Sequence, residues 1–104
     1  MRKIVVLESA AGDIERGREF YDQQGMGVGA YFEDTILSDI ESLSLFHGIH
    51  SMHFGFHRML SERFPFGIYY RETPIQTEVF AVLDLRRHPL WTHKELKGRN
   101  KRTP

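Results

Sequence analysis

The stretch that most constrains the fold is TEVFAVLDL, residues 77–85, which from Val79 onward is apolar on both of its faces except at Asp84. Successive side chains of a strand point to opposite faces of the sheet, so a strand that is apolar on both faces is buried on both. This segment is therefore predicted to be a central strand, with a helix covering one side of it. The rest of the chain must supply that helix and the neighbouring strands.

Two amphipathic helices are predicted before this strand, over residues 10–24 and 28–46. Apolar positions recur at helical spacing in both: Ala10, Ile14, Gly17 and Tyr21 in the first, and Phe32, Ile36, Ile40 and Leu43 in the second. Such spacing is typical of a helix with one buried face. The glycine-rich stretch GMGVG, residues 25–29, separates the two segments and predicts a tight turn. Together they indicate an antiparallel helical hairpin.

Four segments are predicted to be strands, over residues 3–9, 52–60, 66–72 and 77–85. Within the second of them the aromatic and histidine side chains alternate, so His53 and His57 are expected to share one face of a single strand. The element order β-α-α-β-β-β predicts an α+β fold. We expect a four-stranded antiparallel sheet with the first strand at an edge, the helical hairpin packed on one face, and room for a short C-terminal helix over residues 89–96.

The length of 104 residues predicts one domain, residues 1–96, followed by a basic, flexible tail, residues 97–104. The chain has no cysteine, which excludes disulfides and cysteine-ligated metals and favours a cytoplasmic location. No apolar run is long enough to span a membrane, so no membrane association is expected.

The net charge of zero conceals a division between the two halves. Residues 1–46 hold 4 Lys/Arg and 9 Asp/Glu, whereas residues 47–104 hold 10 Lys/Arg, 5 Asp/Glu and all 6 histidines. Such asymmetry favours an anionic partner for the second half, often nucleic acid. A solvated basic face with a basic tail is the alternative explanation.

Four histidines close together in the sequence raise the possibility of a metal site: His47, His50, His53 and His57. A zinc site usually combines histidines with a nearby carboxylate or thiolate at a regular spacing, and neither accompanies them. We therefore predict no metal and no cofactor, and expect exposed histidines on a strand.

The remaining residues able to do chemistry are cations at predicted strand ends and one aromatic: His57, Arg58, Arg63, Arg86, Arg87 and Trp91. They offer no nucleophile, so an enzyme built from them would use one carried by its substrate, such as the 2′-hydroxyl of RNA. Arginine suits phosphate because its planar fork binds two oxygens, and an aromatic ring can stack on a splayed base. If this candidate catalytic set belongs to an enzyme, we expect a metal-independent endoribonuclease.

Structural roles for two of these residues are equally consistent with the sequence. Arg87 could form an ion pair with Asp84 or Glu95, and Trp91 could cover the edge of the core.

The stretches RMLSERFPFGIYYRE, residues 58–72, and VFAVLDLRRHPLW, residues 79–91, resemble the RelE/ParE superfamily of toxins from type II toxin–antitoxin systems. The helical stretch over residues 13–43 is similar to the hairpin of members labelled plasmid-stabilisation proteins. The resemblance implies a small cytoplasmic protein that inhibits growth and is neutralised by a cognate antitoxin, as a homodimer or a toxin–antitoxin hetero-oligomer. The antitoxin is expected to bind the apolar groove between the helical hairpin and the sheet, and the basic C-terminal strands.

Two activities divide this superfamily. RelE-like members cut mRNA on the ribosome with basic residues on the sheet, and ParE-like members bind and inhibit DNA gyrase. By position, Arg58 or His57 matches a basic residue of the nuclease set, Arg86 or Arg87 matches its last arginine, and Trp91 its aromatic. Gly67 stands where a nuclease member typically has arginine. The sequence therefore favours the ParE-like activity, with the RelE-like endoribonuclease as the alternative.

Overall fold

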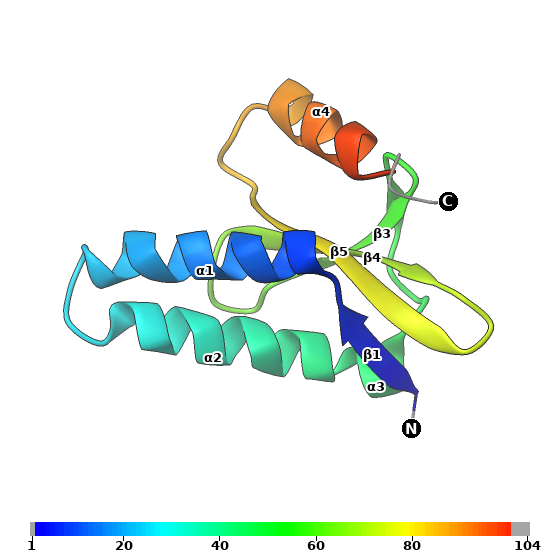
Figure 1. Ribbon diagram of the computed structural model, residues 1–104, viewed down its shortest axis with the longest axis horizontal. Helices are drawn as coiled ribbons and strands as arrows, with labels where there is room; N and C mark the ends of the chain where they lie inside the picture. The colour runs from blue at the N-terminus through cyan, green and yellow to red at the C-terminus, as the bar shows by residue number, and fades with distance from the viewer. Residues whose placement is uncertain (1, 101–104) are drawn as a thin grey trace.

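The structure is a computed structural model that describes residues 2–100. It has an α+β fold with a five-stranded mixed sheet (Figure 1). The elements follow the chain as β1 Lys3–Val6, α1 Glu8–Asp22, α2 Val28–Glu41, α3 Leu43–Phe46, β2 Met52–His53, β3 Phe56–Leu60, β4 Phe66–Glu72, β5 Gln76–Asp84 and α4 Pro89–Asn100. The α+β class, the helical hairpin and the C-terminal helix are confirmed. Two features of the predicted sheet are wrong.

The first wrong feature is the direction of the first strand. The strand order is β1-β5-β4-β3-β2, and β1 pairs with β5 in parallel, whereas the other neighbouring pairs are antiparallel. Consecutive antiparallel strands need only a tight turn, but β1 is separated from the other strands by the whole helical hairpin. The chain therefore returns to pair with β1 only at β5, which lies between β1 and β4.

The second wrong feature is the number of strands. Residues 52–60 are not one strand, because Phe54 and Gly55 form a tight turn between β2 and β3. Both residues have positive φ, 55° and 87°, which is the geometry that two-residue hairpins require. Met52 consequently pairs with His57 across the hairpin, and His53 pairs with Phe56. His53 and His57 therefore do not share one strand.

The sheet buries both of its faces, as the apolar pattern of β5 requires. The hairpin of α1 and α2, which lie side by side in Figure 1, covers one face. The buried residues of this main core are Ala10, Ile14, Phe32, Ile36, Ile40, Leu43, Met59, Phe66, Ile68, Tyr70, Val79 and Val82. A smaller cluster on the other face includes Leu96 of α4, so β5 is covered on two sides rather than the one predicted. The helix predicted over residues 28–46 ends at Glu41, and α3 follows it as a separate short turn.

The edge of β5 beyond β1 is held by side chains rather than by another strand. β1 pairs only with residues 76–79 of β5. Farther along, Ser9 of α1 donates a hydrogen bond to the Phe80 carbonyl, and Asp13 accepts one from the Val82 N–H. Arg99 of α4 donates to the Phe80 carbonyl and also forms an ion pair with Asp13. α1, β5 and α4 are thereby joined at one point.

Residues 97–100, which were predicted to belong to the basic tail, form the last turn of α4. Residues 101–104, the rest of that tail, lie outside the described residues. Among the helices of the described part of the chain, none has the length and apolar character needed to cross a membrane.

Candidate functional site

The arginines differ in whether a carboxylate neutralises them. Ion pairs with Asp or Glu are formed by Arg2, Arg16, Arg18, Arg86 and Arg99. Within residues 2–100, the arginines that form no such ion pair are Arg58, Arg63, Arg71 and Arg87. Arg63 donates to the Tyr31 hydroxyl at 2.9 Å, and Arg71 stacks 4.1 Å over the ring of Phe56. Arg58 and Arg87 have comparable contacts, with Tyr69 and Trp91 respectively, but these two arginines lie together in one pocket.

Both guanidinium groups line one pocket on the face of the sheet that carries α4. The pocket has a volume of about 100 Å³ and is lined by Phe54, Arg58, Tyr69, Leu85, Arg87, Pro89 and Thr92. Its lining thus combines two cations, two hydroxyl groups and no carboxylate. The Nε atom of Arg58 is buried and has no hydrogen-bond partner. A buried donor without an acceptor is costly, so this arginine pocket is suited to receive an oxyanion.

Strand register brings the parts of the arginine pocket together. Arg58 of β3 pairs with Tyr69 of β4. Burial raises the pKa of Tyr69 above its ordinary value, and the neighbouring Arg58 opposes that shift. The Tyr69 hydroxyl therefore stays protonated at neutral pH and can donate a hydrogen bond. Tyr69 was not among the site residues predicted from the sequence. Its position could have indicated it, because Tyr69 lies between Ile68 and Tyr70, which face the main core, and its side chain must therefore point to the opposite face.

Arg87 reaches the pocket from the turn that follows β5. Its N–H donates to the Asp84 carbonyl at 3.2 Å, and its guanidinium carbon lies 3.9 Å from the centroid of the Trp91 ring. Cation–π stacking of this kind holds the arginine without neutralising it. Arg87 pairs with neither Asp84 nor Glu95, which were the partners considered from the sequence; Arg86 binds Asp84 and Arg99 binds Glu95. Trp91 packs against the smaller core cluster, so its predicted covering role is confirmed.

The other three candidate residues lie elsewhere. His57 is on the opposite face of the sheet, where its ring stacks on Tyr70 at 5.0 Å. Arg63 borders an acidic depression along α2, together with Asp34, Asp39 and Glu62. Arg86 binds Asp84 at 2.7 Å and holds the pKa of that carboxyl below its usual value. Of the six candidates, the structure brings Arg58 and Arg87 together with Trp91 beside them.

The space above Gly67, which has no side chain, is occupied by neighbouring side chains of the pocket. A Cβ atom at this position would lie 3.1 Å from Leu85 Cδ2, 3.1 Å from Tyr69 Cε1 and 3.2 Å from Arg58 Cδ. Arg58 thus passes over the backbone of Gly67, where a larger side chain would compete with it. A side chain at position 67 therefore requires Leu85, Tyr69 and Arg58 to shift by a few tenths of an ångström.

Replacing Gly67 with arginine is therefore expected to destabilise the protein by about 1–2 kcal/mol, because Leu85, Tyr69 and Arg58 must all shift to make room for the larger side chain. Alanine at the same position should cost less, since only one methyl group is added. Urea unfolding monitored by circular dichroism measures both. An arginine variant as stable as the wild type would show that Arg58 moves freely out of the pocket.

A larger groove adjoins the arginine pocket and shares Arg87 with it. This β5 groove has a volume of about 380 Å³ and lies between α1, the end of β5 and the start of α4. Its lining residues are Asp13, Arg16, Gly17, Phe20, Phe66, Val82, Leu83, Asp84, Arg87, Trp91 and Glu95. It follows the part of β5 that pairs with β4 on one edge and has no strand on the other edge, beyond β1. An apolar groove between the hairpin and the sheet is what the sequence led us to expect.

Across residues 2–100 there is no group of three or more His, Cys, Asp or Glu side chains arranged to hold a metal ion.

No protein-family model matches the chain, and no curated protein matches its sequence. Among solved structures, it is similar to a chain of the chromosomal ParDE TA (toxin–antitoxin) system from P. aeruginosa. The TM-score is 0.71 at 18% sequence identity, over 82% of this chain and 97% of the other. The two chains share a fold. The likeness confirms the fold that the resemblance to RelE/ParE toxins implied.

Proposed function

We propose that this protein is the toxin of a type II toxin–antitoxin system of the RelE/ParE superfamily. It acts in the cytoplasm by binding a target in the manner of ParE, with DNA gyrase as the expected target, and a cognate antitoxin neutralises it in a hetero-oligomer. The observation that carries this proposal is the similarity to a chain of a ParDE system over 97% of that chain. The motifs around the meander strands, which resemble the same superfamily, support it independently.

The arginine pocket and the β5 groove supply a surface for the antitoxin. Apolar side chains of a partner can enter the groove over Phe66, Val82 and Leu83. An acidic side chain can reach Arg58 and Arg87, which have no carboxylate partner within residues 2–100 and would gain charge-assisted hydrogen bonds. The volume of the arginine pocket, about 100 Å³, suits a carboxylate better than a nucleotide.

The alternative function is a RelE-like, ribosome-dependent mRNA endoribonuclease in which Arg58 and Arg87 bind phosphate. One observation favours it, namely the two unneutralised arginines in one pocket. Three observations weigh against it: His57 lies on the other face, Arg87 covers a face of the Trp91 ring that would stack on a base, and Gly67 contributes no side chain. The arginine pocket therefore has no histidine or carboxylate to act as general base.

Assays with the purified protein separate the two functions. We expect it to block DNA supercoiling by gyrase, and we expect mRNA from cells producing it to remain intact by primer extension. Cuts at fixed codon positions, with gyrase unaffected, would establish the nuclease instead. Activity in neither assay would overturn both assignments of the target.

Antitoxin binding is tested with the small protein encoded in the neighbouring reading frame. Replacing both Arg58 and Arg87 with alanine is expected to weaken binding about 10- to 30-fold at low salt, because two partly exposed charge-assisted contacts are lost. Isothermal titration calorimetry at two salt concentrations measures the change. Arg63→Ala is the matched control, since Arg63 also has no carboxylate partner in residues 2–100 but lies outside the pocket. Equal affinities for the double variant and the wild type would remove the pocket from the interface.

A further inference from the structure

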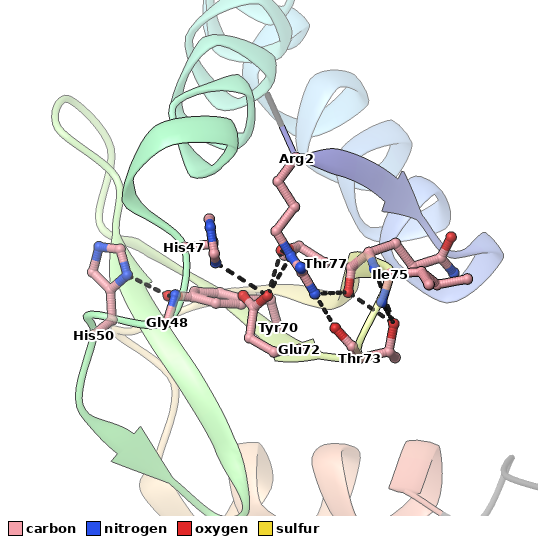
Figure 2. A network of polar contacts seen from close by, with 10 residues as sticks. Arg2, His47, Gly48, His50, Tyr70, Glu72, Thr73, Ile75 and Thr77 are labelled. Carbon is pink, nitrogen blue, oxygen red and sulfur yellow. Dashed lines mark hydrogen bonds and ion pairs between the residues drawn. The ribbon is translucent and has the colours of Figure 1, made fainter.

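The connection between α3 and β2, residues 47–51, is fastened to the sheet through one buried hydroxyl group (Figure 2). Tyr70 of β4 is fully buried, and its hydroxyl oxygen accepts a hydrogen bond from the Gly48 N–H at 3.0 Å. The same oxygen lies 2.5 Å from Nδ1 of His50. The connection also carries Ile49, whose side chain is 72% exposed. Tyr70 is therefore the point at which an exposed, partly apolar segment is anchored.

The protons of this contact can be assigned from the hydrogen bonds. The Tyr70 oxygen accepts from Gly48, and among residues 2–100 its own proton meets no acceptor other than Nδ1 of His50. Nδ1 of His50 must then be an acceptor, and Nε2 carries the proton of the neutral ring. A second proton on His50 would occupy Nδ1 and face the hydroxyl proton. The buried hydroxyl would lose its acceptor, which is unfavourable.

A second histidine adds to this preference for neutral His50. His57 of β3 donates from Nδ1 to the His50 carbonyl at 2.7 Å if that nitrogen carries its proton, and its ring stacks on Tyr70. Burial lowers the pKa of His50, and the proximity of His57 lowers it further. A positive charge on His57 thus disfavours one on His50. Beside them, the Arg58 N–H donates to the Ser51 carbonyl and continues the attachment to β3.

The other titratable groups around residues 47–51 do not contact the Tyr70 hydroxyl in the described residues. One carboxylate oxygen of Glu72 in β4 lies 3.4 Å from Nδ1 of His47, binds Arg2 at 2.8 Å and accepts a hydrogen bond from Thr77. The other oxygen of Glu72 is buried without a partner. His53 of β2 is hydrogen-bonded to Ser51, and burial and Arg58 lower its pKa. Only His50 shares a hydrogen bond with the buried hydroxyl.

We propose that the His50–Tyr70 contact is a pH-sensitive latch, which holds residues 47–51 on the sheet at neutral pH and releases them as the pH falls below about 6.5. The direction follows from linkage: the pKa of His50 is lower in the latched state than in the released one, so release takes up a proton. The full stabilisation of the latched state is present above the ordinary histidine pKa, and it decreases as the pH falls below that value. This inference does not depend on the toxin assignment.

Amide hydrogen exchange of Gly48 is the direct measurement, corrected for the intrinsic pH dependence of exchange. Its protection is expected to fall by up to about tenfold between pH 7.5 and 5.5, because release takes up at most one proton per molecule below pH 6.5. Protection of the β4 and β5 amides should stay constant. A Gly48 amide equally protected at both pH values would overturn the latch.

Two substitutions identify the titrating group. In His50→Asn the amide oxygen takes the place of Nδ1 and accepts from Tyr70 without titrating, so Gly48 should keep its protection at pH 5.5. His53→Gln is the matched control on the same segment and should retain the pH dependence of the wild type. If His50→Asn still loses protection at low pH, while His53→Gln does not, the latch belongs to His53 and the proposal fails.

Discussion

Replacing Asp13 with alanine is expected to lower the free energy of unfolding by about 3–5 kcal/mol, as for other buried ion pairs that lose one partner. The Asp13 side chain is 5% exposed, and that of its partner Arg99 is 12% exposed. The carboxylate also accepts the hydrogen bond of the Val82 N–H at 2.9 Å. Its removal leaves a buried guanidinium and a buried amide without this acceptor, at the point where α1, β5 and α4 meet.

Urea unfolding of a small set of variants checks this expectation. Arg16→Ala is the matched control, because Arg16 binds the same carboxylate but is 69% exposed, and its loss should cost less than about 1 kcal/mol. In the double variant Asp13→Ala, Arg99→Ala, the loss should be smaller than the sum of the two single losses, since each single variant strands the other's partner. An Asp13 variant no less stable than Arg16→Ala would mean that water, not Asp13, stabilises Arg99.

The fold was largely predictable because burial on one face is recorded in the local spacing of apolar residues. The positions chosen for the second helix, Phe32, Ile36, Ile40 and Leu43, are all buried in the main core. The break at Phe54 could not be seen in this way. Tight hairpin turns normally place glycine or asparagine at positive φ, and a phenylalanine in an alternating run has the pattern of a strand.

The pairing of β1 and the extent of α4 depend on contacts that are distant in the sequence. Nothing in residues 3–6 distinguishes a parallel edge strand from an antiparallel one. α4 has few apolar residues and is joined to the fold partly through Arg99 and Asp13, which are 86 positions apart. Because the carboxylate that neutralises Arg99 is so distant in the sequence, the composition of this basic segment alone is that of a flexible tail.

The sequence identified only part of the candidate site, Arg58 and Arg87 with Trp91 beside them, and it did not predict their arrangement. Arg86 and Arg87 are neighbours at a strand end, and the sequence does not determine which of them takes Asp84. The structure gives that carboxylate to Arg86, so Arg87 is left to stack on Trp91. His57 and Arg58 are likewise neighbours, and alternation along β3 sends them to opposite faces. A one-residue difference thus decides which cations reach the pocket.

Replacing Phe32 with alanine is expected to cost about 3–5 kcal/mol, which is typical of a fully buried aromatic ring. Phe32 is 0% exposed, and its ring centroid lies 5.0–5.1 Å from those of Tyr21, Phe64 and Phe66. Urea unfolding should show the loss. Leu37→Ala, on the same helix but 45% exposed, is the control and should be much less destabilising.

The close contact between Gly17 of α1 and the Phe32 ring of α2 allows a second test of the same packing. A Cβ atom at Gly17 would lie 2.5 Å from Phe32 Cε2, so Gly17→Ala should destabilise the wild type, although alanine is the better helix former. In the Phe32→Ala background the obstacle is gone, and the same substitution should stabilise the protein by up to about 1 kcal/mol. A glycine on the apolar face of α1 is thus explained by the ring on α2. If Gly17→Ala changes the free energy of unfolding in the same direction in both backgrounds, the Phe32 ring does not determine how closely the two helices pack.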